Sequence, residues 1–172
     1  MNDETTRVLV SAGSKHGSTL EIAEKIGEVL RDRGYEVDVT PPDKVAGLDR
    51  YDAVILGSAV YAGHWTSSAV ELAEKVAERR ENLATWMFSS GPIGDPPKPE
   101  EDPADIAEII ETTRARAHQI FSGKIDRSKL SFGEKAILIA VRAPEGDFRD
   151  WDEIAAWAGE IADQLTRETS AR

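Results

Sequence analysis

The fold is decided by residues 8–19, which read VLVSAGSKHGST. The first three residues are bulky and apolar, which predicts a short buried strand, and residues 13–19 follow as a glycine- and hydroxyl-rich turn. Apolar residues then recur at helical spacing up to Leu30, and Gly34 supplies a C-cap for the predicted helix. The chain therefore opens with a strand, a turn and a helix, which is the first unit of an α/β fold.

The same alternation continues along the chain. The predicted strands are 35–39, 53–56, 84–88 and 118–121, and the predicted helices are 67–80, 104–116 and 151–165. Asp150 is the N-cap that we expect for the last helix. Nearly continuous apolar strands alternating with helices predict an α/β fold with five parallel strands and helices on both faces. We expect residues 1–172 to form a single doubly wound domain.

The composition argues against several classes of protein. The 172 residues include 21 Lys and Arg against 32 Asp and Glu, and the resulting net charge of −11 argues against a nucleic-acid partner. With no cysteines and three histidines, we expect no thiol catalysis and no metal site. The first residues are acidic where a signal peptide is basic, and the longest apolar runs, 53–56 and 136–141, are too short to span a bilayer. We expect a cytoplasmic protein without a transmembrane segment.

Three loops of unusual composition follow predicted strands, at residues 13–19, 57–65 and 89–95. Ligands of open parallel sheets bind at the carboxyl ends of the strands, so these loops are the predicted binding site. Loop 13–19 lacks the Walker and G-x-G-x-x-G patterns, which disfavours nucleoside triphosphates and dinucleotides. Its glycines, hydroxyls and helix N–H groups suit a monophosphate, and the alternative is an ordinary helix start with Ser and Thr caps. The residues expected to hold the phosphate are Ser14, Lys15, His16, Gly17, Ser18 and Thr19.

Residues 13–19, Gly-Ser-Lys-His-Gly-Ser-Thr, resemble the phosphate loop of the flavodoxin family, Gly-Ser-x-Thr-Gly-x-Thr, which also follows the first strand. The sequence departs from the family at His16, where its ring or backbone N–H would replace a threonine hydroxyl. The resemblance implies a flavodoxin-like three-layer sandwich with strand order 2-1-3-4-5. It also implies FMN as the cofactor.

In flavodoxin-like proteins the second and third loops flank the flavin ring. Tyr61 and Trp65 are candidates to stack on the ring, and the alternative is that both merely pack under the loop. Backbone N–H groups of the third loop would reach the polar edge of the ring, unless this loop is a plain turn stiffened by Pro92. His64 is more often a surface residue than a proton carrier at such a position. The residues assigned to the ring are Ala59, Val60, Tyr61, Ala62, Gly63, His64, Ser90, Gly91, Pro92, Ile93, Gly94 and Asp95.

Three further stretches resemble the menaquinone-dependent protoporphyrinogen oxidases, a flavodoxin-like subgroup: Gly63-His64-Trp65, residues 120–125, and Asp150-Trp151. The resemblance implies an FMN-dependent oxidoreductase that passes electrons from a porphyrinogen to a quinone, with an insert in its fifth strand. No catalytic side chain is assigned, because the flavin carries the electrons. Two alternatives stay open: an electron carrier whose acidic surface meets a redox partner, and a flavin-free interaction module.

Residues 124–142 interrupt the alternation and correspond to this insert. They hold five basic and two acidic residues, which is a local charge of +3. We interpret them as one wall of the substrate site or as a contact with the inner face of the membrane, because propionates and anionic lipids both attract basic residues. The alternative is that the apolar run 136–141 is ordinary core, in a short helix or an extra strand.

Overall fold

The computed structural model describes residues 5–61, 63–91, 106–125 and 146–170. Its main sheet holds five parallel strands in the order β2-β1-β3-β5-β6, which is the order 2-1-3-4-5 expected from the sequence. They are β1 (Arg7–Gly13), β2 (Glu36–Val39), β3 (Ala53–Tyr61), β5 (Ala84–Ser90) and β6 (His118–Phe121). The predicted fold class is therefore confirmed.

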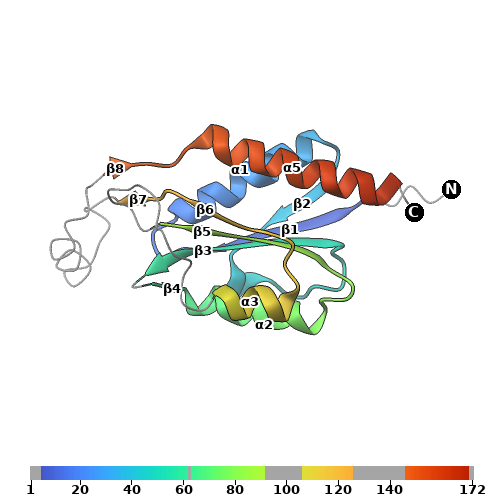
Figure 1. The fold of residues 1–172 in the computed structure, drawn as a ribbon, viewed down its shortest axis with the longest axis horizontal. Helices are drawn as coiled ribbons and strands as arrows, with labels where there is room; N and C mark the ends of the chain where they lie inside the picture. The colour runs from blue at the N-terminus through green and yellow to red at the C-terminus, as the bar shows by residue number, and fades with distance from the viewer. Residues whose placement is uncertain (1–4, 62, 92–105, 126–145, 171–172) are drawn as a thin grey trace.

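Helices cover both faces of this sheet, as Figure 1 shows. One face carries α1 (Ser18–Asp32) and α5 (Trp151–Ser170), and the other carries α2 (Ser67–Glu78) and α3 (Ile106–Thr113). A 3-10 turn, η1 (Pro42–Lys44), follows β2. Ile22, Ile26 and Leu30 recur on one side of α1 and are fully buried, so this apolar stripe holds α1 against the sheet. In the part of the chain that the structure describes, no helix is long and apolar enough to cross a membrane.

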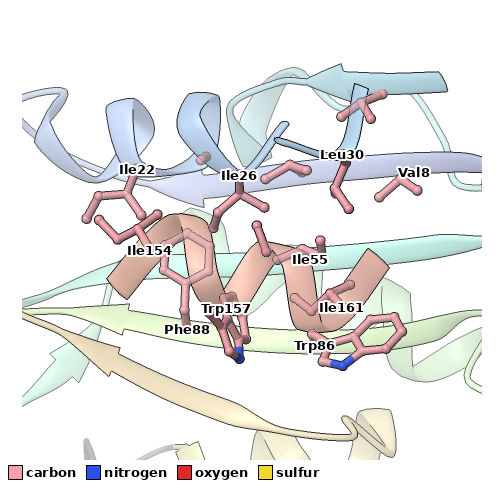
Figure 2. Packing of buried hydrophobic residues seen from close by; sticks show 14 of the residues in the cluster. Val8, Ile22, Ile26, Leu30, Ile55, Trp86, Phe88, Ile154, Trp157 and Ile161 are labelled. Atoms are coloured by element: carbon pink, nitrogen blue, oxygen red, sulfur yellow. The ribbon is translucent and has the colours of Figure 1, made fainter. Parts of the chain in front are cut away.

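The side chains of β1 alternate between two cores, one on each face. Val8 belongs to the core under α1 and α5, whereas Leu9 belongs to the core over α2 and α3. Figure 2 shows Phe88 and Trp157 in the first core. The ring centroid of Phe88 lies 6.0 Å from those of Phe121 and Trp157, and the last two lie 5.6 Å apart. Each such aromatic pair contributes about 0.5–1.5 kcal/mol beyond its area burial, so α5 is firmly attached to the sheet.

Local signals explain most helix boundaries. The C-cap residue of α1 is Arg33, and Gly34, predicted to end the helix, follows it with φ 94°. The Asp150 carboxylate accepts the Glu153 N–H at 3.1 Å, which confirms the predicted N-cap of α5. The prediction that the third helix reaches residue 116 is wrong, because α3 ends at Thr113 where Arg114 takes φ 56°.

Two short antiparallel pairings were not predicted. Strand β4 (His64–Trp65) folds back onto the end of β3, and β7 (Lys124–Ile125) pairs with β8 (Gly146–Asp147). The predicted insert therefore starts in β7, and its residues 126–142 lie outside the described residues. What the structure adds is the position of the two flanking strands, which lie side by side.

Candidate functional site

The carboxyl ends of β1, β3 and β5 lie in register, so the three predicted loops begin next to one another. Gly13 at the end of β1 is the register partner of Ser58, and Ser58 is the register partner of Ser89. Figure 1 shows β4, β7 and β8 at this same end of the molecule, near the start of α1. The structure therefore brings the starts of the three loops together at the edge of the sheet that their composition predicted.

The first loop turns tightly into α1. Gly17 is the N-cap position, with φ 87°, a conformation that residues with a Cβ rarely adopt. Its N–H donates to the Ser14 Oγ at 2.9 Å, and its carbonyl accepts the Glu21 N–H at 3.1 Å. Thr19, in the first turn, is only 1% exposed, and its Oγ1 is buried without a hydrogen-bond partner in the described chain. Of the other predicted phosphate residues, Lys15 is exposed and His16 and Ser18 are half-buried.

An unpartnered buried hydroxyl at a helix start is the feature that tests whether a phosphate fits. Leaving such a group unsatisfied costs about 1–3 kcal/mol. The N–H groups of the first helical turn have no partners within the helix, and the helix dipole favours an anion there. The Thr19 hydroxyl and these N–H groups therefore suit an anion with several oxygens, and a phosphate group fits.

The start of α2 is packed directly against the end of β1. A Cβ on Gly13 would lie 1.9 Å from the Thr66 Oγ1, so only glycine allows this approach. Thr66 caps α2 by accepting the Ala69 N–H at 3.4 Å, and its own N–H donates to the Ser58 Oγ at 2.9 Å. Sequence reasoning missed Thr66, although a threonine just before the helical run 67–78 is an ordinary N-cap signal.

The second loop is a hairpin rather than an open loop. Val60 pairs with Trp65 and Tyr61 with His64, and Gly63 takes φ 80° in the turn between them. Among the predicted ring residues, Ala59 is buried, Val60 is half-buried, and Gly63 and His64 are exposed, whereas Ala62 lies outside the described residues.

Trp65 belongs to this hairpin and is buried. The residue is 5% exposed, and its Nε1 donates to the Ser89 Oγ at 2.8 Å. The same Ser89 Oγ lies 2.8 Å from the His118 Nε2, so three strands are joined by one serine. The packing alternative therefore holds for Trp65, and Tyr61 stays the predicted stacking residue.

The third loop begins with three buried residues, Ser89, Ser90 and Gly91. The Gly91 N–H donates to the Phe121 carbonyl at 3.0 Å, and Gly91 has φ 80°. A Cβ on Gly123 would come within 3.2–3.3 Å of the Ser90 Oγ and the Gly91 nitrogen, so this loop lies tightly against the end of β6. The other predicted residues of this loop, 92–95, lie outside the described residues.

Sequence reasoning also missed Arg149. Its side chain is 4% exposed and binds Asp147, Glu21 and the carbonyl of Ser18. The guanidinium hydrogen bonds lower the pKa of the Asp147 carboxyl, against the opposing effect of partial burial, and the same contacts raise the pKa of Arg149. No local pattern indicates the contacts with α1, because Arg149 lies 131 positions from Ser18 in the chain.

The chain is similar in sequence to a dehydrogenase and in structure to solved flavodoxins. It is 24% identical over 184 residues to the protoporphyrinogen IX dehydrogenase [quinone] of Escherichia coli (strain K12), with 95% of this chain and 98% of that protein covered. A flavodoxin from the domain Archaea superposes with a TM-score of 0.64 at 19% identity, covering 94% of this chain and 99% of the other. The Fusobacterium nucleatum flavodoxin mutant K13G, bound to flavin mononucleotide, has a TM-score of 0.52 at 12% identity and covers 69% of each chain.

The family comparison is more direct. The model of the flavodoxin domain matches residues 9–152, which include all three loops of the candidate site. This match, together with the flavodoxins among the similar structures, supports FMN as the cofactor expected from the sequence. The chain belongs to the flavodoxin domain family.

Proposed function

We propose that this chain binds FMN at the carboxyl edge of its sheet and is an oxidoreductase that acts through the bound flavin. The observation that carries the proposal is the Thr19 hydroxyl, which is buried at the start of α1 with no partner in the described chain. A phosphate oxygen would satisfy this hydroxyl and the N–H groups of the same helical turn.

Six residues of the first loop, 14–19, would surround the phosphate. Ser14 accepts the Gly17 N–H through its Oγ, which leaves the hydroxyl hydrogen to donate to a phosphate oxygen. His16 stands where the family has a threonine, so its ring or backbone N–H would take the place of one hydroxyl. Lys15 adds the positive charge of the loop.

The flavin ring would lie between the hairpin of residues 59–64 and the loop that starts at Ser90. The Gly91 N–H is already used by the Phe121 carbonyl, so the contacts of this loop with the ring fall to its other backbone groups. When bound, FMN supplies the electron-transfer chemistry, and the surrounding chain supplies binding and orientation.

The finer proposal is oxidation of protoporphyrinogen IX with a quinone as acceptor. It is supported by the similarity to the Escherichia coli dehydrogenase over 95% of this chain. It is further supported by the paired strands β7 and β8, because these strands lie at the end of the molecule where the flavin would lie. We propose that basic residues of the insert form one wall of the substrate site, with the membrane surface as the source of the quinone.

Chromophore analysis tests the cofactor. The purified protein should absorb as a flavoprotein, and chromatography of the heat-released chromophore should give FMN. A dominant FAD peak would contradict the monophosphate assignment. A protein that neither carries nor takes up flavin would instead be the flavin-free interaction module.

Turnover tests the substrate. The holoprotein should oxidise protoporphyrinogen IX in the presence of a menaquinone analogue, and reduction of the flavin without turnover would favour an electron carrier. Reversing Lys124, Arg127 and Lys129 to Glu should lower this turnover and change its salt dependence. A matched control reverses the exposed Lys44, Lys75 and Arg80, which changes the net charge equally away from the site. Equal effects of the two triple variants would mean that the insert is not part of the substrate site.

A further inference from the structure

Arg149 is a buried arginine between β8 and α5, and its partners come from both ends of the chain. Its side chain is 4% exposed. It binds Asp147 in a bidentate manner, at 2.8 Å to Oδ1 and 2.7 Å to Oδ2, and Glu21 of α1 at 3.1 Å. It also donates to the carbonyl of Ser18 at 3.2 Å and lies 4.6 Å from the centroid of the Trp151 ring.

The position of this cation needs an explanation. The N-terminus of a helix carries a partial positive charge, so a cation beside the first turn of α1 is unfavourable by itself. Here the carboxylates of Glu21 and Asp147 offset that effect. The guanidinium fixes the relative positions of three groups, because its planar fork binds all of them at once. They are the Ser18 carbonyl, the Glu21 carboxylate of the first turn of α1, and the Asp147 carboxylate of β8.

Ser18 is the first residue of α1, and the phosphate would bind at this turn. We propose that Arg149 is a positioning residue for the phosphate loop, which holds the first turn of α1 against β8 in the geometry that receives the phosphate. The inference rests on the proposed function. It adds that flavin affinity depends on a residue that acts through Ser18 and Glu21, far from the loop in sequence.

The chain contains a matched control at the other end of the same helix. Arg33, just beyond α1, binds Asp163 of α5 at 2.6 Å, so it also links the segment of α1 to that of α5. Its side chain is 41% exposed, and it lies about 20 Å along the helix from Ser18. Arg33→Gln removes the same charge and a similar link, but it leaves the phosphate end untouched.

The test compares the affinities of two flavins for the apoprotein. FMN and riboflavin differ only in the phosphate, so the ratio of their affinities isolates the phosphate loop from the ring site. Apoproteins of the wild type, Arg149→Gln, Arg149→Lys and Arg33→Gln are titrated with each flavin by fluorescence quenching. Urea unfolding of each apoprotein measures stability separately.

We expect Arg149→Gln to lower the FMN affinity about ten-fold and the riboflavin affinity less than about two-fold. Arg149→Lys should recover part of the loss, because lysine keeps the charge but not the fork. Arg33→Gln should leave both affinities unchanged. If Arg149→Gln yields no folded protein, Glu21→Gln is used instead, and the same selective loss of FMN affinity is expected.

An equal fall in both affinities, or an unchanged FMN affinity, would overturn the positioning role and leave the proposed function standing. A wild-type protein that binds neither flavin would overturn the proposed function, and this inference with it.

Discussion

The two ends of the sheet use polar residues in opposite ways. At the amino end, Arg7 of β1 binds Glu36 of β2 at 3.0 Å, and the two side chains are 54% and 58% exposed. At the carboxyl end, the Thr19 hydroxyl is buried without a partner in the described chain, and Arg149 is buried among carboxylates. Exposed pairs contribute about 0–1 kcal/mol, so the amino end gains little from its charges and loses little without them.

The carboxyl end, by contrast, holds polar groups that burial makes costly. A fold tolerates such groups where a ligand or a fixed geometry offsets the cost. The difference teaches that the carboxyl end keeps these polar groups out of solvent, whereas the amino end leaves its ion pair exposed. Each of the following predictions tests one side of this comparison.

The largest effect is expected at Thr19. Thr19→Val keeps the shape of the side chain and removes the hydroxyl, so FMN affinity should fall about ten- to a hundred-fold, equivalent to about 1.5–3 kcal/mol. The free energy of unfolding of the apoprotein should stay constant or rise, because an unsatisfied buried hydroxyl is removed. Flavin titration and urea unfolding measure the two quantities. Unchanged affinity with lowered stability would mean that Thr19 serves only the helix start.

The next effect concerns the contact between β1 and α2. Gly13→Ala would place a Cβ 1.9 Å from the Thr66 Oγ1, which must then move. We expect the free energy of unfolding to fall by about 1–3 kcal/mol in urea. The control is Gly47→Ala, where an added Cβ meets nothing within 4 Å, and a change within about 0.5 kcal/mol is expected there. Equal changes at the two sites would contradict the close approach.

A smaller, pH-dependent effect is expected at Asp147. Its pKa is lowered mainly by the hydrogen bond from Arg149, so the folded state binds this proton less readily than the unfolded chain does. Its stabilising contribution is therefore fully present above the unfolded pKa of about 3.9 and is lost as the pH falls through the lower folded value. Because Asp147 is 40% exposed, the loss in Asp147→Asn at pH 7 should be only about 1 kcal/mol.

Urea unfolding at a series of pH values checks this expectation. The difference between wild type and Asp147→Asn should be constant between about pH 5 and pH 7 and should shrink below about pH 4. A difference that grows on acidification would mean that the ion pair with Arg149 does not stabilise the fold.

The smallest effect is expected at the amino end. Glu36→Gln breaks the exposed pair with Arg7, and the free energy of unfolding should change by about 0.5 kcal/mol or less, with FMN affinity unchanged. Thermal unfolding and flavin titration measure the two outcomes. A change in affinity here would remove the contrast between the two ends of the sheet.

Local patterns in the sequence predicted the elements and the edge at which the loops meet. The apolar run of residues 53–56 lies in a central strand, Gly34 follows the end of α1, and Asp150 caps α5. The strand order was implied by the family resemblance. These features depend on residues that are close to one another in the sequence, so local patterns can predict them.

The features that the sequence left open or missed depend on distant partners. Whether Trp65 stacks or packs stayed open, because its packing in the core and its bond to Ser89, 24 positions away, are not indicated by residues 57–65. Arg149 binds α1 from 128 positions away or more, so neither residue spacing nor composition could predict it. Packing in three dimensions decided both, and only the structure contains it.

The strand pair β7–β8 has a consequence for how this chain can vary. Ile125 and Gly146 are register partners, so the chain leaves the sheet and returns to it at one point. Because β7 and β8 hold these two points together, each doubling of the length of a segment that joins them costs only about 0.6 kcal/mol of chain entropy. Segments of very different length and composition can therefore be exchanged between β7 and β8 while the main sheet keeps its strand order.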